Sequence, residues 1–258
     1  MLNAINKGQV NTKIDSIGIA TIEFGHPSSN SLPGNVLQEL ADTITEFGIN
    51  DCVKVIMIKS IGDRAFCAGA SFDELISIKD SNTGKKFFSG FAKVINACRK
   101  CPKFIVGRVQ GKAVGGGVGL ASSFDYCLAT KYADIKLSEL AIGIGPFVVG
   151  PAVERKIGLS AMSQLTINAT EWRSAKWAKE KGLYAEIYDN VEELDKQVDV
   201  LLKKLANSNP ESMKLLKSNF WKGTENWDSL LQDRASISGE LVLSDFTINA
   251  INSFKNKK

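Results

Sequence analysis

The segment from Gly111 to Leu120, Gly-Lys-Ala-Val-Gly-Gly-Gly-Val-Gly-Leu, constrains this chain more than any other part of its sequence. An apolar run at 103–109 precedes it and an apolar stretch at 120–123 follows it, which predicts a strand that turns through glycines into a helix. A glycine backbone can approach a ligand closely, and amides at a helix N-terminus point at negative charge. The segment is neither a Walker loop nor a clean dinucleotide fingerprint, because it lacks Gly-Lys-Ser/Thr and a suitably placed acidic residue. From the residues alone, it is either an anion-binding turn or a tight structural turn.

Short apolar runs alternate with helical patterns in the first 150 residues. Residues 18–24 and 53–59 are β-branched runs that predict strands, and apolar residues recur at helical spacing between them. Further strands are predicted near 103–109, 125–129 and 134–137. After residue 150 strand signals nearly vanish, and the segments that look helical are 151–158, 160–168, 171–181, 191–206, 211–221 and 227–250. The pattern predicts an α/β fold with largely parallel strands, followed by a helical C-terminal part.

Composition and charge exclude several classes of protein. The 258 residues carry a formal charge of only +4 with no dense basic block, so we expect no nucleic-acid partner. No run of about 18 apolar residues and no signal-peptide pattern is present, so we expect neither a membrane span nor secretion. Five cysteines are an odd number for a disulfide framework and favour a reducing cytoplasm.

Metal and triad chemistry have little support in the sequence. The chain has one histidine, His26, in a turn-like segment, which leaves little basis for a histidine metal site or a Ser-His-Asp triad. Cys98 and Cys101 have redox or zinc spacing, but there is no second cysteine pair, so we interpret them as ordinary thiols at a helix end.

Two further segments carry candidate chemistry. Residues 63–75 contain small residues directly after the strand at 53–59, so backbone amides from two loops can meet at the strand ends, where open α/β sheets bind ligands. Glu139 lies in an otherwise apolar, glycine-rich run. Burial there raises the pKa of a carboxyl group and suits it to proton transfer. The alternative for Glu139 is a capping or salt-bridged residue.

These segments, in this order and spacing, resemble the crotonase superfamily, also called the enoyl-CoA hydratase/isomerase family. The resemblance implies a spiral of β-β-α units followed by C-terminal helices that build trimers, often paired into hexamers. We therefore expect a crotonase-like α/β core with an acyl-CoA site over 1–190, and a helical oligomerisation region of the same fold over 191–258. The motifs that carry the resemblance are Asn30-Ser-Leu-Pro33, Phe66-Cys-Ala-Gly-Ala70, Gly115-Gly-Gly-Val-Gly-Leu-Ala121 with Asp125, the Glu139 loop and Gly182-Leu183.

The resemblance also implies a site and its chemistry. Two backbone amides, which fall on Ala70 and Gly116, hold the thioester oxygen of an acyl-CoA and stabilise the enolate formed during reaction. Glu139 is the expected catalytic acid/base. CoA is part of the substrate, so no metal or other cofactor is expected. The residues expected to bind substrate are Cys67, Ala68 and Phe147.

The chain departs from the family pattern at two positions. Gly119 occupies the place of an acidic residue that family hydratases usually carry, and Ser71 replaces a common Asp. With one carboxylate, moving a proton between two carbons is straightforward, whereas adding water needs another partner, so the residues favour a double-bond isomerase. One alternative is an enoyl-CoA or methylglutaconyl-CoA hydratase that uses an acid from another loop, such as Asp73, Glu74 or Glu154. The other is a non-catalytic crotonase-like protein that binds CoA or RNA or serves as an assembly subunit.

Overall fold

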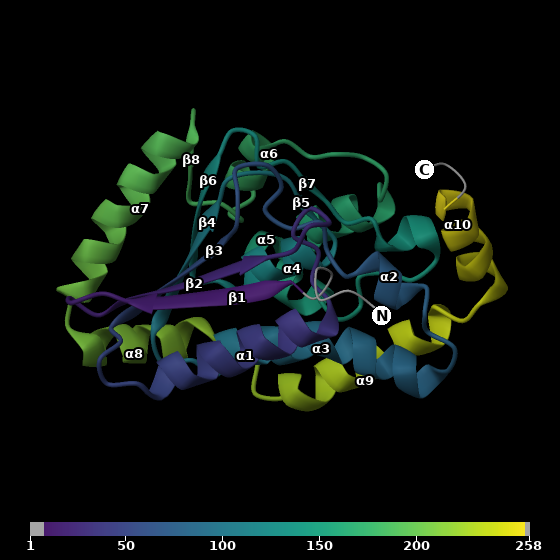
Figure 1. Ribbon diagram of the computed structural model, residues 1–258, viewed down its shortest axis with the longest axis horizontal. Coiled ribbons are helices and arrows are strands. Elements are labelled where there is room, and N and C mark those ends of the chain that lie inside the picture. Colours follow the sequence, from purple (N-terminus) through teal and green to yellow (C-terminus); the bar gives the residue numbers. More distant parts are fainter. Residues whose placement is uncertain (1–7, 256–258) are drawn as a thin grey trace.

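The computed structural model of the protein describes residues 8–255 and contains a six-stranded sheet (Figure 1). The strands lie in the order β1-β2-β3-β4-β6-β8, with β1 antiparallel to β2 and all other pairs parallel. Their bounds are β1 (Gln9–Ile14), β2 (Ile19–Gly25), β3 (Val55–Ser60), β4 (Phe104–Val109), β6 (Tyr126–Thr130) and β8 (Glu186–Tyr188). A second, two-stranded parallel sheet pairs β5 (Ala113–Val114) with β7 (Ile135–Lys136).

Helices cover both faces of the large sheet (Figure 1). The first group is α1 (Gly34–Ile49), α2 (Phe72–Leu75), α3 (Ser81–Lys100), α4 (Gly116–Ser123) and α5 (Gly150–Ile167). The second group is α6 (Ala175–Glu180), α7 (Val191–Ala206), α8 (Pro210–Phe220), α9 (Trp227–Leu241) and α10 (Asp245–Lys255). A 3₁₀ helix, η2 (Glu139–Ile142), follows β7.

The alternation of side chains along each strand decides which helix it meets. In β2, Ala20, Ile22 and Phe24 belong to the main core, which also includes the apolar faces of α1, α3 and α4. Ile19, on the opposite face, packs in a smaller core with Leu194 of α7. Helix α7 therefore closes one face of the sheet, while α1 and α3 close the other, with α9 packed against α3.

The predicted fold class is confirmed, with local differences. The predicted strands at 18–24 and 53–59 correspond to β2 and β3, and the predicted helix between them is α1. The expected pair of helices at 151–158 and 160–168 forms α5, which Gly158 interrupts with a φ of +79°. The expected helix at 227–250 is two helices, α9 and α10. Strands β1 and β8 were not predicted.

The two regions expected at 1–190 and 191–258 extend beyond the described chain at residues 1–7 and 256–258. Across residues 8–255, no helix is both long enough and apolar enough to span a membrane.

Candidate active site

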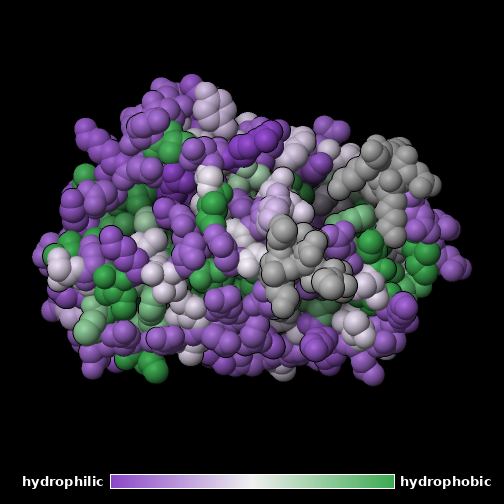
Figure 2. Space-filling view, in the orientation of Figure 1, coloured by the Kyte–Doolittle hydropathy of each residue, from purple (hydrophilic) through white to green (hydrophobic). Residues whose placement is uncertain are grey.

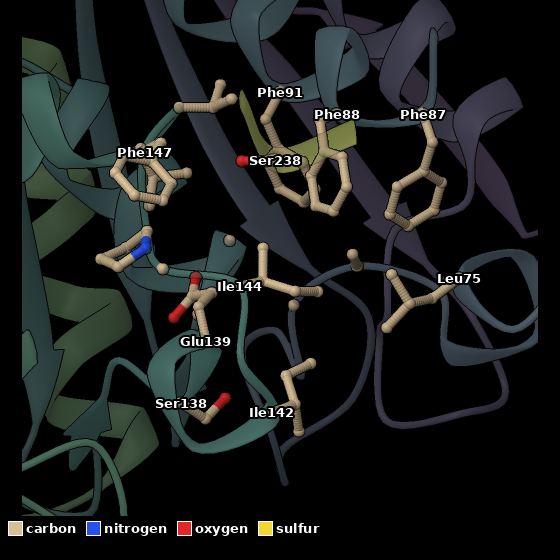
Figure 3. Close-up of a pocket in the computed structure, with 18 of the residues that line it drawn as sticks. Leu75, Phe87, Phe88, Phe91, Ser138, Glu139, Ile142, Ile144, Phe147 and Ser238 are labelled. Atoms are coloured by element: carbon tan, nitrogen blue, oxygen red, sulfur yellow. The ribbon is translucent and has the colours of Figure 1, made fainter. Parts of the chain in front are cut away.

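A cavity of about 190 Å³ lies where the loops after β3 and β5, the η2 loop and helices α3 and α9 converge (Figure 3). Most of its wall is aliphatic or aromatic. Helix α3 contributes Phe87, Phe88 and Phe91. Glu139 comes from η2, and Phe147 comes from the segment between η2 and α5.

Two loops are held side by side at one end of this cavity. Cys67 forms a parallel bridge with Ala113, and the Val114 amide donates to the Cys67 carbonyl at 2.9 Å. A methyl group placed on Gly69 would lie 3.5 Å from the Gly116 amide nitrogen. The pairing therefore brings the predicted residues Ala70 and Gly116 to the same wall of the cavity.

The amides of Ala70 and Gly116 donate no hydrogen bond to any described residue. Gly116 is the first residue of α4, where an amide has no partner within its own helix. The preceding Gly115 has a φ of +53°, a conformation that other residues rarely adopt, which lets the chain turn sharply from β5 into α4. The arrangement offers two unpaired donors, one of them at the positive end of a helix, to a partly negative oxygen.

Glu139 begins η2 and faces the cavity (Figure 3). Its Oε2 atom is buried without a hydrogen bond, and burial raises the pKa of its carboxyl group from 4.5 to about 7. A methyl group on Gly115 would lie 2.9 Å from its Oε1 atom, which places the carboxyl group directly beside the glycine turn. Near neutral pH, such a group both accepts and returns a proton readily.

Position 119 lies on α4 with no room for a side chain. A methyl group on Gly119 would lie 2.4 Å from Cγ1 of Val149, which itself lines the cavity. The space beside Gly119 is therefore filled by valine, and no acidic side chain takes its place.

The structure brings no alternative acid to the cavity wall among the described residues. Asp73 and Glu154 are exposed, and neither lines the cavity. Glu74 accepts a hydrogen bond from the Gly34 amide at 2.8 Å and so caps the start of α1. Glu139 is the one titratable side chain in the part of this wall that the structure describes.

The other predicted binding residues divide into two groups. Ala68 and Phe147 line the cavity, whereas Cys67 does not. The Cys67 thiol is fully buried, accepts a hydrogen bond from the Gly69 amide at 3.4 Å, and has its pKa raised to about 12 by burial. Cys67 therefore stabilises the loop that carries Ala70 and does not contact the cavity.

Sequence reasoning missed the aromatic side chains of α3 and Ser238 of α9. The run Lys-Phe-Phe-Ser-Gly-Phe at 86–91 is an aromatic helical face, but nothing in it indicates that it lines the same cavity as Glu139. Over residues 8–255, no group of three or more His, Cys, Asp or Glu side chains is arranged to hold a metal ion.

Comparisons with known proteins identify relatives over most of the chain. A family model described as enoyl-CoA hydratase/isomerase matches residues 15–242. A probable enoyl-CoA hydratase of Bacillus subtilis is 26% identical over 242 residues, which cover 93% of each chain. The mitochondrial methylglutaconyl-CoA hydratase of Homo sapiens is 29% identical over 201 residues, 76% of this chain and 58% of that protein. In the crystal structure of an enoyl-CoA hydratase from Bacillus halodurans, 99% of that chain aligns with 95% of this one at 20% identity, with a TM-score of 0.86.

Proposed function

Because the chain belongs to the enoyl-CoA hydratase/isomerase family and is an enzyme of that family, we propose that it moves the double bond of an enoyl-CoA thioester. The observation that carries this proposal is the single carboxyl group, Glu139, in the described wall of a cavity that also presents two unpaired amides. The substrate supplies its own CoA, and the reaction uses no metal or other cofactor.

The amides of Ala70 and Gly116 bind the thioester oxygen. When a proton leaves the acyl chain, negative charge develops on that oxygen, and fixed donors stabilise it better than they stabilise the neutral thioester. Removing one such donor costs about 3 kcal/mol in known oxyanion holes. The N-terminus of α4 adds the favourable end of a helix dipole at Gly116.

Glu139 transfers the proton. As a carboxylate, it takes a proton from one carbon of the acyl chain, and the C–H electron pair enters the conjugated enolate. The resulting carboxylic acid returns the same proton to the carbon at the other end of the conjugated system, so the double bond moves and no atom is gained or lost. Hydration would require a second group to position water, and Val149 fills the space at Gly119.

The second candidate is a hydratase, because relatives at 26% and 29% identity are named hydratases. In that case the acid missing at position 119 would be replaced by a group other than the described lining residues.

A panel of 2-enoyl-CoA and 3-enoyl-CoA thioesters separates these candidates. Absorbance of the conjugated thioester reports double-bond migration, and mass spectrometry reports the addition of water. We expect migration without a gain of water, and a loss of about 10²- to 10⁴-fold in Glu139→Gln. Formation of 3-hydroxyacyl-CoA would instead establish the hydratase. If the wild type and Glu139→Gln were equally inactive on every thioester, the proposed isomerisation would be wrong.

The C-terminal helices suggest assembly, and we propose a homotrimer or a dimer of trimers. Large apolar side chains are exposed on three helices: Leu215, Leu216 and Phe220 on α8, Ile237 on α9, and Phe246 and Ile248 on α10. On the face shown in Figure 2, hydrophobic residues form separate patches among hydrophilic ones, one of them at the end of the molecule where α10 lies. Light scattering that shows a stable monomer at micromolar concentration would contradict this proposal. The five free cysteines support a cytoplasmic location.

A further inference from the structure

Ser238 is the single residue that α9 contributes to the cavity wall (Figure 3). It is only 1% exposed, and its hydroxyl group makes no hydrogen bond within the described chain. Other serines of the same helix behave differently: the Ser236 hydroxyl donates to the Gln232 carbonyl at 3.2 Å, and the Ser229 hydroxyl donates to the Asn226 carbonyl at 3.0 Å. Ser238 therefore presents an unpaired polar group to an apolar cavity.

The position of Ser238 is fixed by a close crossing of α3 and α9. A methyl group on Gly84 would lie 2.7 Å from the Gly239 carbonyl oxygen, so the two backbones touch at this pair of glycines. The Ser89 hydroxyl donates to Gln232 Oε1 at 2.9 Å and ties the same two helices together. Because α9 is held against α3, the backbone of Ser238 stays beside the aromatic wall.

An unpaired hydroxyl group in such a place is costly unless a ligand pairs with it. Burying a hydroxyl without a partner destabilises a protein, whereas alanine would fill nearly the same space in a helix at no such cost. Ser138, at the other side of the cavity, is partly exposed, so water can reach it. Beside Glu139, Ser238 is thus a second, nearly buried polar group of this wall, and its hydroxyl group has no hydrogen-bond partner among the described residues.

The remaining wall limits the charge and size of that partner. The described lining contains no Lys, Arg or His, and its one titratable group is Glu139. A carboxylate in the acyl group would add a second acidic group beside Glu139 and would be buried without a counter-charge, which is strongly unfavourable. The volume of 190 Å³ suits a group of about six carbons, because a cavity of about 150 Å³ lined by Leu, Ile and Phe holds benzene.

We propose that the acyl group of the substrate carries an uncharged oxygen, as a hydroxyl or keto group, that hydrogen-bonds to Ser238. The serine hydroxyl donates to a keto oxygen and either donates to or accepts from a hydroxyl. Ser238 enters the cavity from α9 and Glu139 from η2 (Figure 3), and we place the oxygen in the outer part of the acyl chain, beyond the carbons that react. This inference rests on the proposed acyl-CoA function and adds the substrate class.

Calorimetric binding of saturated thioesters tests the inference without requiring turnover. The probes are hexanoyl-CoA and a series of hexanoyl-CoA thioesters in which a hydroxyl or keto oxygen is moved along the outer half of the chain. We expect the wild type to bind at least one oxygenated probe about 5- to 10-fold more tightly than hexanoyl-CoA, as one neutral hydrogen bond allows. Adipyl-CoA, which ends in a carboxylate, should bind more weakly than hexanoyl-CoA.

Ser238→Ala should remove the preference for the oxygenated probe and leave hexanoyl-CoA binding unchanged or tighter. The matched control is Ser236→Ala, which removes a hydroxyl that is bonded within α9 and should keep the preference. Thermal unfolding monitored by circular dichroism establishes that both variants are folded.

The other outcomes distinguish an error in the role of Ser238 from an error in the proposed acyl-CoA function. If the wild type binds hexanoyl-CoA as tightly as every oxygenated probe, or if Ser238→Ala keeps the preference, the role of Ser238 is wrong while the acyl-CoA function stands. If the preference is present but enoyl-CoA thioesters are hydrated, the isomerase is wrong and the role of Ser238 stands. If no acyl-CoA binds, both are wrong.

Discussion

Glu139 sits where its negative charge is unfavourable for folding and useful for proton transfer. Its Oε2 atom is buried without a hydrogen bond, so the neutral carboxylic acid is favoured in the folded protein and the pKa is raised from 4.5 to about 7. An unfolded chain solvates the same group and returns its pKa to the ordinary value. Folding stability must therefore depend on pH through this one residue.

Glu139→Gln should stabilise the protein in a pH-dependent way. Below about pH 4.5 the carboxyl group is protonated in both states, so the difference between variant and wild type is small and constant. As pH rises from 4.5 to about 7, the unfolded chain loses its proton first, and the wild type loses up to about 3 kcal/mol of stability that the neutral glutamine does not lose. Urea unfolding of both proteins across this range measures the difference, and a difference that is independent of pH would mean that the carboxylate is solvated.

Gly119 and Val149 form a pair of residues that must be changed together. Gly119→Glu alone should destabilise the protein and give no hydratase activity, because even its Cβ would lie 2.4 Å from Val149 Cγ1. Gly119→Glu combined with Val149→Gly frees this space and should add water to 2-enoyl-CoA, measured as the mass gain of the product. Val149→Gly alone is the control and should remain an isomerase. High hydratase activity in the wild type would contradict the argument from a single carboxylate.

At the scale of elements, helix α1 shows what local pattern can predict. Its apolar spacing marked the helix, which begins at Gly34 and ends at Ile49, with Leu37, Leu40 and Ile44 buried. Helix α4 was predicted near residues 120–123 from its apolar pattern, yet it begins at Gly116 and includes glycines, which are poor helix formers. All eight of its residues are buried, so packing outweighs propensity there. Strand β1 was missed because it is an exposed edge strand without a buried alternating face.

The candidate site also contains residues that local sequence predicts and a residue that it does not. Ala70, Gly116 and Glu139 were predicted from motif positions, and their loops meet at one cavity, although their roles remain predictions. Ser238 could not be predicted, because α3 and α9 are joined by a contact across 143 residues of sequence, as in the Ser89–Gln232 hydrogen bond. Local pattern carries no signal for a contact between helices so far apart.

The crossing of α3 and α9 predicts a strongly unequal response to two glycine substitutions. Gly239→Ala should destabilise the protein by about 1–3 kcal/mol, because its methyl group would lie 2.5 Å from the Lys85 amide nitrogen and push the helices apart. Gly34→Ala, at the start of α1, meets only the Glu74 carboxyl group at 3.5 Å and should change stability little. Guanidinium unfolding of the two variants measures this contrast. If Gly239→Ala and Gly34→Ala were equally stable, α3 and α9 would be able to move apart without loss of unfolding free energy.

At the scale of the whole molecule, a buried ion pair attaches α8 to the α/β core. Lys217 Nζ donates to Asp125 Oδ2 at 2.8 Å and to the Lys103 carbonyl at 2.7 Å, and both charged side chains are almost fully buried. Asp125 also accepts from Trp221 Nε1 at 3.2 Å and from the Ile105 amide at 2.8 Å. The network joins the chain just before β6 to residues more than ninety positions later. Desolvation offsets much of the attraction in such a pair, but losing one partner leaves the other charge buried alone.

Lys217→Met should therefore destabilise the protein by about 3–5 kcal/mol. The double variant Asp125→Asn with Lys217→Met leaves no uncompensated charge and should recover most of that loss. Lys214→Met, on the exposed side of α8, is the matched control and should change stability by less than about 0.5 kcal/mol. Denaturant unfolding followed by tryptophan fluorescence measures the stability of all three variants. Trp221 is a local reporter, because its indole group donates to Asp125 of the ion pair. If Lys217→Met and Lys214→Met lowered the free energy of unfolding equally little, α8 would be held to the α/β core by its apolar contacts alone. The ion pair would then contribute nothing to this attachment.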